Sequence, residues 1–363
     1  MTFLWVSMNM ILSALVCGIG GPGISTGKPG ITVWYGRHQQ VGHLGPAQDD
    51  FNLLGCLWPP EQFKKMSYTL NHNQPVELTI AREPAGFRRL ARPGHFNADM
   101  PIRDLRPGKN RIVLTAVRAD GTRLSEDIYV HRHEYGVCRL PYSIHWEDVN
   151  HPQEVGQCVD GLWQLEPKGL HTGHIGYDRI FLVGNTSWRD YEVSVPLTIH
   201  GVSEQTGLRH GGNGVGLILR FNGHVVGGHR AFPPAQPKWG YQPFGAIGWL
   251  RWKRGFNESA PQLEFYRGDN DRTTHYGVYP VKLERTYWMK MRCDTLPDTS
   301  EGQGVTRYSF KIWPDGQEES QTWRWQTIQT SEHALRRAGI GLLAHHVDAT
   351  FGDITVVPVN AKR

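Results

Sequence analysis

Residues 104–132 read DLRPGKNRIVLTAVRADGTRLSEDIYVHR, and this stretch decides the class of fold. A Pro-Gly-Lys-Asn turn precedes a run in which Ile112, Leu114 and Ala116 occupy every second position, and an Ala-Asp-Gly turn leads into a final run. Alternating apolar residues are typical of a half-buried strand, and a short turn between two such runs predicts a hairpin. The stretch therefore predicts β-structure.

The composition of the whole chain is that of a globular all-β protein. Its 363 residues are 39% hydrophobic and 20% charged, and they include 42 Gly and 23 Pro. This length is sufficient for two domains with separate cores, and short apolar runs between turn residues are typical of strands. The net charge of +5 is spread along the chain, so the sequence lacks the basic stripe of a nucleic-acid-binding protein.

Residues 1–21, MTFLWVSMNMILSALVCGIGG, are apolar and end in small residues, which predicts a cleaved signal peptide and a secreted, extracellular or cell-surface protein. A membrane anchor and a buried first strand are the alternatives. The run is short for a transmembrane helix, so we expect no stable membrane insertion after cleavage. In an oxidising compartment Cys138 and Cys158 form the expected disulfide, whereas Cys56 and Cys293 are equally well explained as buried thiols.

The chain divides into two predicted β-regions. Residues 28–133 form a small sandwich, a polar hinge covers 134–160, and the second region covers 140–360. Short links without crossover helices favour antiparallel pairing in the second region. Its candidate strands are RIFLVG (179–184), YEVSVPLTIH (191–200), GVGLILRF (214–221), FGAIGWLRW (244–252), QLEFYRG (262–268), RTYWMKMRCD (285–294), RYSFKIW (307–313), AGIGLLAHH (338–346) and ATFGDITVVPV (349–359).

Two resemblances follow from these motifs. The hairpin at 104–132 resembles the terminal hairpin of immunoglobulin-like or cadherin-like modules. The motifs YWMKMR (287–292), YSFKIW (308–313) and GDITVV (352–357) resemble the concanavalin A-like lectin/glucanase jelly roll, in particular its laminin-G-like group. The resemblances imply an immunoglobulin-like sandwich followed by a jelly roll, with ligands on the concave sheet of the jelly roll.

Alternation along the strands predicts which side chains point away from the core and onto that concave sheet. If the strands are neighbours, one surface combines aromatic and charged groups that suit an acidic glycan, because aromatic faces stack on sugar rings and Arg binds carboxylates bidentately. The alternative is a solvated face whose Arg and Lys only prevent aggregation. The predicted ligand-binding residues are Arg220, Trp249, Arg251, Lys290 and Arg292, with Glu264 and Tyr266 on the same surface.

The sequence leaves open whether this surface is catalytic. Laminarinase-type enzymes of the resembling group use an E-x-D-x-x-E strand, and the alginate-lyase members use Arg-x-Glu-Leu and Gln-x-His strands, none of which occurs here. A lyase could still combine a tyrosine acid, a histidine base and an arginine that neutralises a carboxylate. The candidate residues are Tyr266 or Tyr241 as acid, His224 or His229 as base, Arg220, and Glu264 as a further catalytic carboxylate.

Metal binding is a minor hypothesis. His171 and His174 are three residues apart, but neighbouring glycines disfavour a helix, so this spacing does not place them on one face, and we expect them in a loop beside the groove. Asp348 and Asp353 could hold a structural calcium ion; no cofactor is required. Three functions remain: a secreted glycan-binding protein, a polysaccharide lyase or glycoside hydrolase acting in the same groove, and a structural cell-surface or matrix protein.

Overall fold

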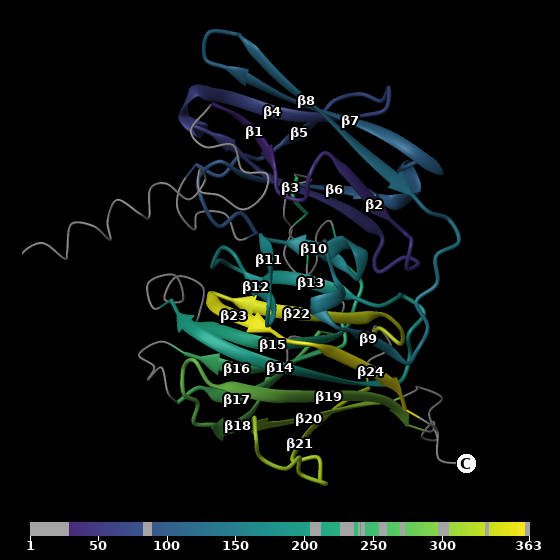
Figure 1. Ribbon diagram of the computed structural model, residues 1–363, viewed down its shortest axis with the longest axis vertical. Coiled ribbons are helices and arrows are strands. Elements are labelled where there is room, and N and C mark those ends of the chain that lie inside the picture. Colours follow the sequence, from purple (N-terminus) through teal and green to yellow (C-terminus); the bar gives the residue numbers. More distant parts are fainter. Residues whose placement is uncertain are drawn as a thin grey trace, which may run out of the picture.

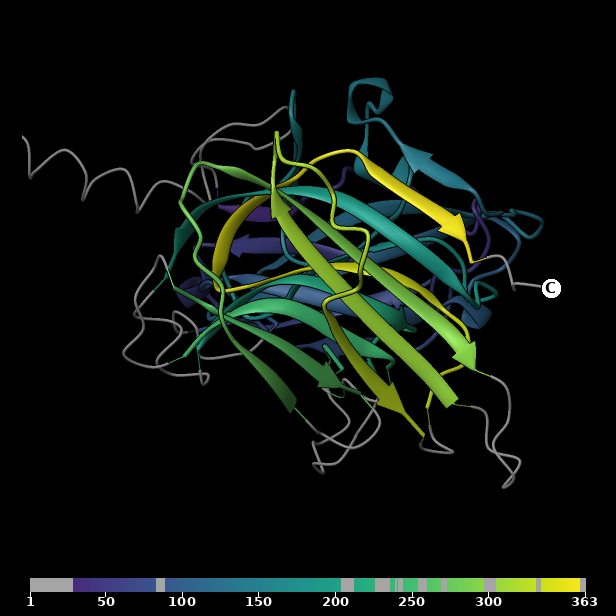
Figure 2. The same cartoon turned by 90° about the horizontal axis from the view of Figure 1, so that it is seen from below.

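Two β-sandwiches are stacked on each other in the computed structural model (Figure 1). The structure describes residues 29–82, 89–203, 212–225, 236–238, 240, 244–253, 260–268, 273–296, 305–330 and 334–359. The predicted signal peptide at 1–21 lies outside these residues. Seen from below, the C-terminal sandwich lies in front of the N-terminal one (Figure 2). The all-β class predicted from the sequence is confirmed.

The N-terminal sandwich packs a three-stranded sheet on a five-stranded sheet. Phe51, Leu53 and Phe96 from the first and Ile112 and Leu114 from the second meet in one buried core. The three-stranded sheet has the order β1 (Gly30–Val33), β3 (Asp50–Trp58) and β6 (His95–Pro101). The five-stranded sheet has the order β2 (His38–Val41), β8 (Arg123–Arg132), β7 (Gly108–Arg118), β4 (Phe63–Leu70) and β5 (Val76–Leu78). Two 3₁₀ turns, Pro60–Gln62 and Ile102–Asp104, connect strands here.

The two strands of the predicted hairpin at 104–132 are confirmed. β7 and β8 pair antiparallel from Gly108↔Arg132 to Val117↔Arg123. Ile112, Leu114 and Ala116 are fully buried, as their alternation predicts. Apolar burial of this kind stabilises by about 25 cal/mol per Å², so the alternating residues fix which face of the hairpin turns inward.

The C-terminal sandwich is larger and consists of a seven-stranded and a nine-stranded sheet. The seven-stranded sheet has the order β10 (Gln157–Asp160), β13 (Arg179–Val183), β22 (Gly339–His345), β15 (Asn213–Phe221), β16 (Ala246–Trp252), β17 (Gln262–Arg267) and β18 (Thr273–Val278). The nine-stranded sheet has the order β11 (Trp163–Glu166), β12 (Gly169–Thr172), β23 (Val347–Phe351), β14 (Tyr191–Val202), β19 (Thr286–Leu296), β20 (Val305–Pro314) and β21 (Trp325–Gln329), and β24 (Ile354–Pro358) joins β14 to β9 (Tyr142–Ile144). All described pairings in these two sheets are antiparallel, as expected.

The main core lies between these two sheets. Val215, Leu217 and Leu219 on β15 face Met289 and Met291 on β19, and all five are fully buried. Each of the nine predicted strands is present, but 349–359 is divided at Gly352 and Asp353 into β23 and β24. Six further strands, β9 to β12, β18 and β21, lack a clear alternating pattern and were not predicted.

Residues 134–160, the predicted hinge, contribute directly to the C-terminal sandwich. They include β9, β10 and the 3₁₀ turns Trp146–Asp148 and Pro152–Glu154. Trp146 and Cys158 belong to the main core, and so do Tyr35 and Leu54 from the N-terminal region. The two regions therefore share buried contacts, while the boundaries of the two domains stay a prediction.

The predicted Cys138–Cys158 disulfide is absent, and both cysteines are buried thiols. Cys158 interacts with the hydroxyl of Tyr35, while Cys138 lies near Tyr142. Burial raises the pKa of both thiols to about 12. The sequence separation suited a disulfide, but the two side chains have different neighbours in the core.

Candidate functional site

The outer face of the seven-stranded sheet, which points away from the main core, has an apolar and a charged part. Nine buried apolar side chains, among them Ile180, Ile218 and Phe244, form a second core there. Trp249 belongs to this core and also to the adjoining charged part, here called the outer-face cluster: Asp178, Trp249, Arg251, Glu264 and His345. The cluster is the candidate site.

The register of the strands aligns the members of this cluster in neighbouring rows. Trp249 on β16 lies opposite Glu264 on β17 and Gly216 on β15, and Arg251 and His345 flank Gly214. A Cβ atom on Gly214 would lie 2.5 Å from Cε3 of Trp249. The glycine is therefore needed for the indole to rest on the sheet between Arg251 and His345.

Trp249 links a cation and a carboxylate. The guanidinium carbon of Arg251 lies 4.5 Å from the centre of the indole ring, within the range of a cation–π contact. The indole Nε1 donates a hydrogen bond of 3.0 Å to Oε1 of Glu264. Glu264 is 4% exposed, and its Oε2 lies 2.9 Å from Nδ1 of the half-exposed His275. The carboxylate is thus buried under an edge that remains open to solvent.

Asp178 and His345 form a buried pair at the other side of Trp249. The Oδ1 atom of Asp178 lies 2.7 Å from Nδ1 of His345, and their exposed fractions are 7% and 4%. Burial lowers the pKa of His345, and the cations of Arg251 and Arg179 act in the same direction, against the carboxylate of Asp178. The imidazole is therefore neutral near pH 7.

The acidic and the basic groups of the outer-face cluster differ in how deeply they are buried. The carboxylates of Asp178 and Glu264 are buried, whereas Arg251 is partly exposed and Lys253 beside it has a side chain that is 45% exposed. Burial lowers the pKa of Arg251, while Glu264 and Asp178 raise it, so the guanidinium interacts with both carboxylates. An incoming ligand would meet the cations first.

The structure contradicts the expected position of Arg220. A register shift between Leu219 and Phe221 interrupts the alternation of β15, and Arg220 has a left-handed φ of 55°. Its side chain is fully buried and donates to Oδ1 of Asp190 at 3.0 Å and to Oγ1 of Thr306 at 2.8 Å. Arg220 therefore connects the two sheets instead of lining the outer face, because a β-bulge reverses the side on which a residue points.

Lys290 and Arg292 lie on the other sheet. Both are on β19 of the nine-stranded sheet and point away from the main core. Lys290 Nζ lies 2.8 Å from Glu319, and Arg292 Nε lies 3.5 Å from Asp294. The expectation of one shared surface is therefore wrong for these two residues, because alternation identifies a face but not the sheet to which the face belongs.

The residues predicted to be catalytic do not all lie together in the structure either. Tyr266 and Glu264 share the outer face, with Tyr266 tilted against Phe244 at 5.7 Å between ring centres. His224 is buried and bonds to Oδ2 of Asp160 at 2.7 Å, away from this cluster. His229 and Tyr241 lie outside the described residues.

The predicted calcium ligands have other partners. Asp348 lies 2.6 Å from Nε2 of His171, and Asp353 accepts from the backbone N–H of Trp146 and lies 2.9 Å from His145. Among the described residues no group of three or more His, Cys, Asp or Glu side chains is suited to hold a metal ion. The described residues therefore offer no calcium site, and a bound calcium ion remains a proposal.

The contacts of His171 and His174 indicate a structural role. His171 lies on β12 and contacts Asp348 and Glu166. His174 is buried and stacks on His95 of the N-terminal sandwich with ring centres 5.3 Å apart. This pair belongs to the boundary between the sandwiches, not to a metal site.

A second charged cluster at that boundary was not predicted. This interface network consists of Arg89 and Asp99 from the N-terminal region, and of Asp160, His224 and Lys238 from the C-terminal region. Arg89 donates to Asp160 at 2.5 Å and to both oxygens of Asp99 at 2.6 and 2.9 Å. Contacts between residues that are 10 to 149 positions apart give no signal in a single sequence.

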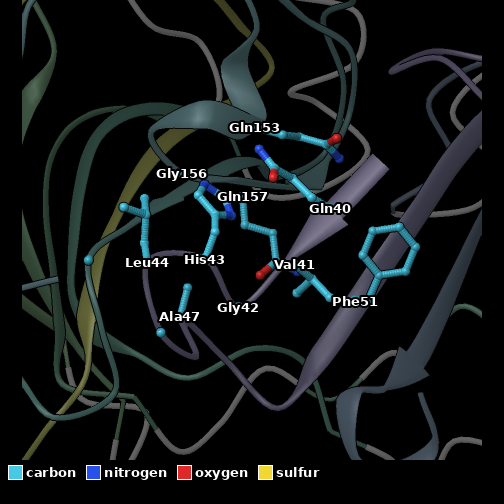
Figure 3. A pocket seen from close by; sticks show the side chains of 12 residues that line it. Gln40, Val41, Gly42, His43, Leu44, Ala47, Phe51, Gln153, Gly156 and Gln157 are labelled. Carbon is cyan, nitrogen blue, oxygen red and sulfur yellow. The ribbon is translucent and has the colours of Figure 1, made fainter. Parts of the chain in front are cut away.

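A small hollow lies near the same boundary (Figure 3). Side chains of Gln40, His43 and Gln157 surround it, and it has no Asp, Glu, Lys or Arg among its lining residues. The amide of Gln157 already donates to the backbone oxygen of Asp50 at 2.7 Å. The hollow offers few groups for a polar ligand, so we do not assign the function to it.

No helix in the described residues is long and apolar enough to cross a membrane. No protein family and no curated protein matches the sequence.

Solved structures with a similar arrangement of strands include three carbohydrate-related proteins. The exoplasmic/lumenal domain of VIP36 bound to Ca²⁺ and Man₃GlcNAc has a TM-score of 0.37 and 12% identity, covering 62% of this chain and 92% of that one. A xylan β-1,4-xylosidase from Bacillus halodurans C-125 has a TM-score of 0.38 and 12% identity, covering 87% and 64%. GH43B of a Bacteroides ovatus xyloglucan locus has a TM-score of 0.33 and 9% identity, covering 94% of this chain and 67% of that one. At these values the likenesses assign neither a family nor an activity to this chain.

Proposed function

We propose that the protein is a secreted glycan-binding protein and that it binds acidic polysaccharide at the outer-face cluster. The observation that supports this most directly is the stacking of Arg251 on Trp249 above the buried carboxylate of Glu264. A planar guanidinium can hold a sugar carboxylate bidentately.

The preference for an acidic ligand follows from the order of the charges. Arg251 and Lys253 are the more exposed members of the site, while the carboxylates of Asp178 and Glu264 lie beneath them. A polyanion would approach the cations first, and its binding should weaken as salt screens them. A neutral glycan would not show this salt dependence.

The proposal is tested by measuring binding to alginate and polygalacturonate, with neutral xylan as comparison. Arg251→Ala should weaken binding to the acidic polymers by about 1.5–3 kcal/mol, the range for a hydrogen bond to a charged group. Arg292→Ala is the matched control, because Arg292 is partly buried beside a carboxylate on the opposite sheet. Equal losses from both variants, or binding to xylan alone, would contradict the proposal.

An enzyme that cleaves polysaccharide is the second candidate. Both carboxylates of the cluster lie within hydrogen-bonding distance of histidine rings, Asp178 beside His345 and Glu264 beside His275. Neither is placed as the independent carboxylic acid that most glycoside hydrolases use. The specific observation in favour of an enzyme is the Asp178–His345 pair, which suits lyase chemistry better than hydrolysis. If the protein were instead a structural cell-surface or matrix protein, we would expect neither the acidic polymers nor xylan to bind.

A further inference from the structure

Three tryptophan side chains lie on the outer face of the nine-stranded sheet instead of in a core. Trp288 on β19 and Trp313 on β20 are cross-strand partners, and each follows a residue that points into the main core. Trp323 lies over Nζ of Lys311 on the same face, at 4.7 Å from the nitrogen to the ring centre. None of the three belongs to a hydrophobic core of the described residues, and all three are partly exposed. Apolar side chains that gather on a surface often mark a binding site.

Pro196 extends the cross-strand pair into what we call the tryptophan row: Pro196, Trp288 and Trp313. Pro196 on β14 lies opposite Trp288, on the side away from Trp313. A proline within a central strand removes a hydrogen bond of the ladder, but β14 changes its partner from β24 to β23 at this position. The carbonyl of Pro196 still accepts from the N–H of Gly352 at 2.7 Å. The sheet therefore accommodates three ring-shaped side chains next to one another.

The two indoles of the tryptophan row are held in a fixed arrangement. Their planes differ by 13°, and their ring centres are 6.4 Å apart. Nε1 of Trp288 donates to Oδ1 of Asp315 at 2.8 Å, so the turn after β20 orients this ring. Rings that are already positioned lose little conformational freedom when a ligand stacks on them.

The basic residues beside the tryptophan row have acidic partners. Lys290 Nζ lies 2.8 Å from Glu319, and Lys311 contacts the same carboxylate. Arg292 Nε lies 3.5 Å from Asp294. A polyanion would therefore gain little from this face, whereas the C–H surface of a sugar ring stacks on an indole without a charge.

We propose that the tryptophan row is a second glycan-binding surface and that it binds a neutral polysaccharide, whose sugar rings stack on Trp288 and Trp313. Asp315 is exposed and uses one carboxylate oxygen for Trp288, so its other oxygen can accept a hydrogen bond from a sugar hydroxyl. This surface does not depend on the outer-face cluster, which lies on the seven-stranded sheet.

The positions of the two surfaces suit a protein that bridges two polymers. The two sheets of the C-terminal sandwich face each other across the main core, so their outer faces point in opposite directions. In addition, β19 and β20 lie at the end of the molecule opposite the N-terminal sandwich (Figure 1). We expect one molecule to hold an acidic polymer on one face and a neutral polymer on the other. This bridging rests on the proposed function.

Binding to neutral xylan and to hydroxyethylcellulose, measured by affinity electrophoresis of the full chain, tests the second surface. Trp288→Ala and Trp313→Ala should each weaken this binding by about tenfold or more, because tryptophans carry much of the energy of a contact surface. Binding should persist in high salt, and Trp313→Ala should leave binding to polygalacturonate unchanged. Trp58→Ala is the matched control, since Trp58 is 38% exposed but lies on the N-terminal sandwich. Absence of binding to both neutral polymers, or equal losses in Trp58→Ala and Trp313→Ala, would overturn the inference.

A measurement on the wild-type protein locates each ligand without relying on the folding of a variant. In ¹⁵N-labelled protein, xylan should shift the indole N–H signal of Trp288, and polygalacturonate should shift that of Trp249, with Trp288→Phe and Trp249→Phe used only to assign the signals. A xylan response at Trp249 instead of Trp288 would overturn the inference. A xylan response at Trp288 without any response to polygalacturonate would refute the proposed function and the bridging, and it would leave the second surface intact.

Bridging is measured with xylan beads and soluble polygalacturonate. The beads should retain polygalacturonate only when the protein is present, and either Arg251→Ala or Trp313→Ala should abolish the retention. Retention that survives both substitutions would show that the two surfaces do not hold the polymers together.

Discussion

Two clusters of charged side chains that the described residues bury, the interface network and the outer-face cluster, differ in how fully their hydrogen bonds are satisfied. In the interface network, the five N–H groups of the Arg89 guanidinium are matched by contacts to Asp160, Asp99, the Lys238 carbonyl and the Val159 carbonyl. In the outer-face cluster, Nε2 of His345 has no partner among the described residues. The contacts of the first cluster suit a structural role, and the second is the cluster to which we assign the proposed ligand.

The physical reason is the cost of desolvation. A buried ion pair is favourable only when nearly all its donors and acceptors are matched, because water no longer satisfies them. The carboxylate of Asp160 meets this condition, with Arg89 on one oxygen at 2.5 Å and His224 on the other at 2.7 Å. In the outer-face cluster, Nε2 of His345 does not meet it, although atoms beside the interface network, such as Oδ1 of Asn97, are unmatched as well.

The largest expected effect is on the interface network. Asp160→Asn should lower the free energy of unfolding by about 3–5 kcal/mol, because it leaves the buried cation of Arg89 without one of its two carboxylates. Urea unfolding followed by tryptophan fluorescence measures this. Asp353→Asn is the control, since Asp353 pairs with an exposed histidine and should cost under about 1 kcal/mol. A loss below about 1 kcal/mol in Asp160→Asn would show that the network is not stabilising.

The two clusters also differ in how much of each could be predicted from the sequence. Trp249, Glu264 and Tyr266 could be placed on one face from alternation alone, because period two is a local property of a strand. The bulge at Arg220 could not be predicted, since no glycine or proline marks it. The pairing of Asp178 with His345 gives no signal in the sequence, because the two residues are 167 positions apart.

The interface network was beyond single-sequence reasoning for a different reason. Arg89 and Asp160 are 71 positions apart and belong to different sandwiches, so only the packing of the two brings them together. Alternation along β19 showed correctly that Lys290 and Arg292 point outward, but it could not show that β19 is in the nine-stranded sheet. Local periodicity therefore predicts which face of a strand a residue occupies. The order of the strands in the sheets decides which of these residues lie together in a site.

Acid should remove the stabilisation that Asp160 gives to the interface network. Burial alone would raise the pKa of Asp160, but Arg89 and His224 lower it to about 2. A carboxyl whose pKa is lower in the folded state stabilises the protein above its ordinary pKa of about 4, and this stabilisation is lost as the pH falls towards 2.

The loss from this group should amount to about 2 kcal/mol between pH 5 and pH 2, and urea unfolding across this range measures it. Asp160→Asn supplies the comparison, because the variant lacks the titrating carboxyl and its stability should depend less steeply on pH. Identical pH dependence in the two proteins would mean that other carboxyls determine acid unfolding and that Asp160 does not.

The smallest change in the free energy of unfolding is expected when a carboxylate of the outer-face cluster is replaced by an amide. Asp178→Asn should change the free energy of unfolding by less than about 1 kcal/mol, although Asp178 is only 7% exposed. An amide oxygen can still accept the hydrogen of His345 Nδ1, and Asn tolerates the left-handed φ of 46° as well as Asp does. Removing the charge also removes its desolvation cost. Unfolding in urea beside Asp160→Asn compares the two carboxylates directly. If Asp178→Asn were as destabilising as Asp160→Asn, both clusters would be structural, and the proposed ligand binding at the outer face would lose its physical basis.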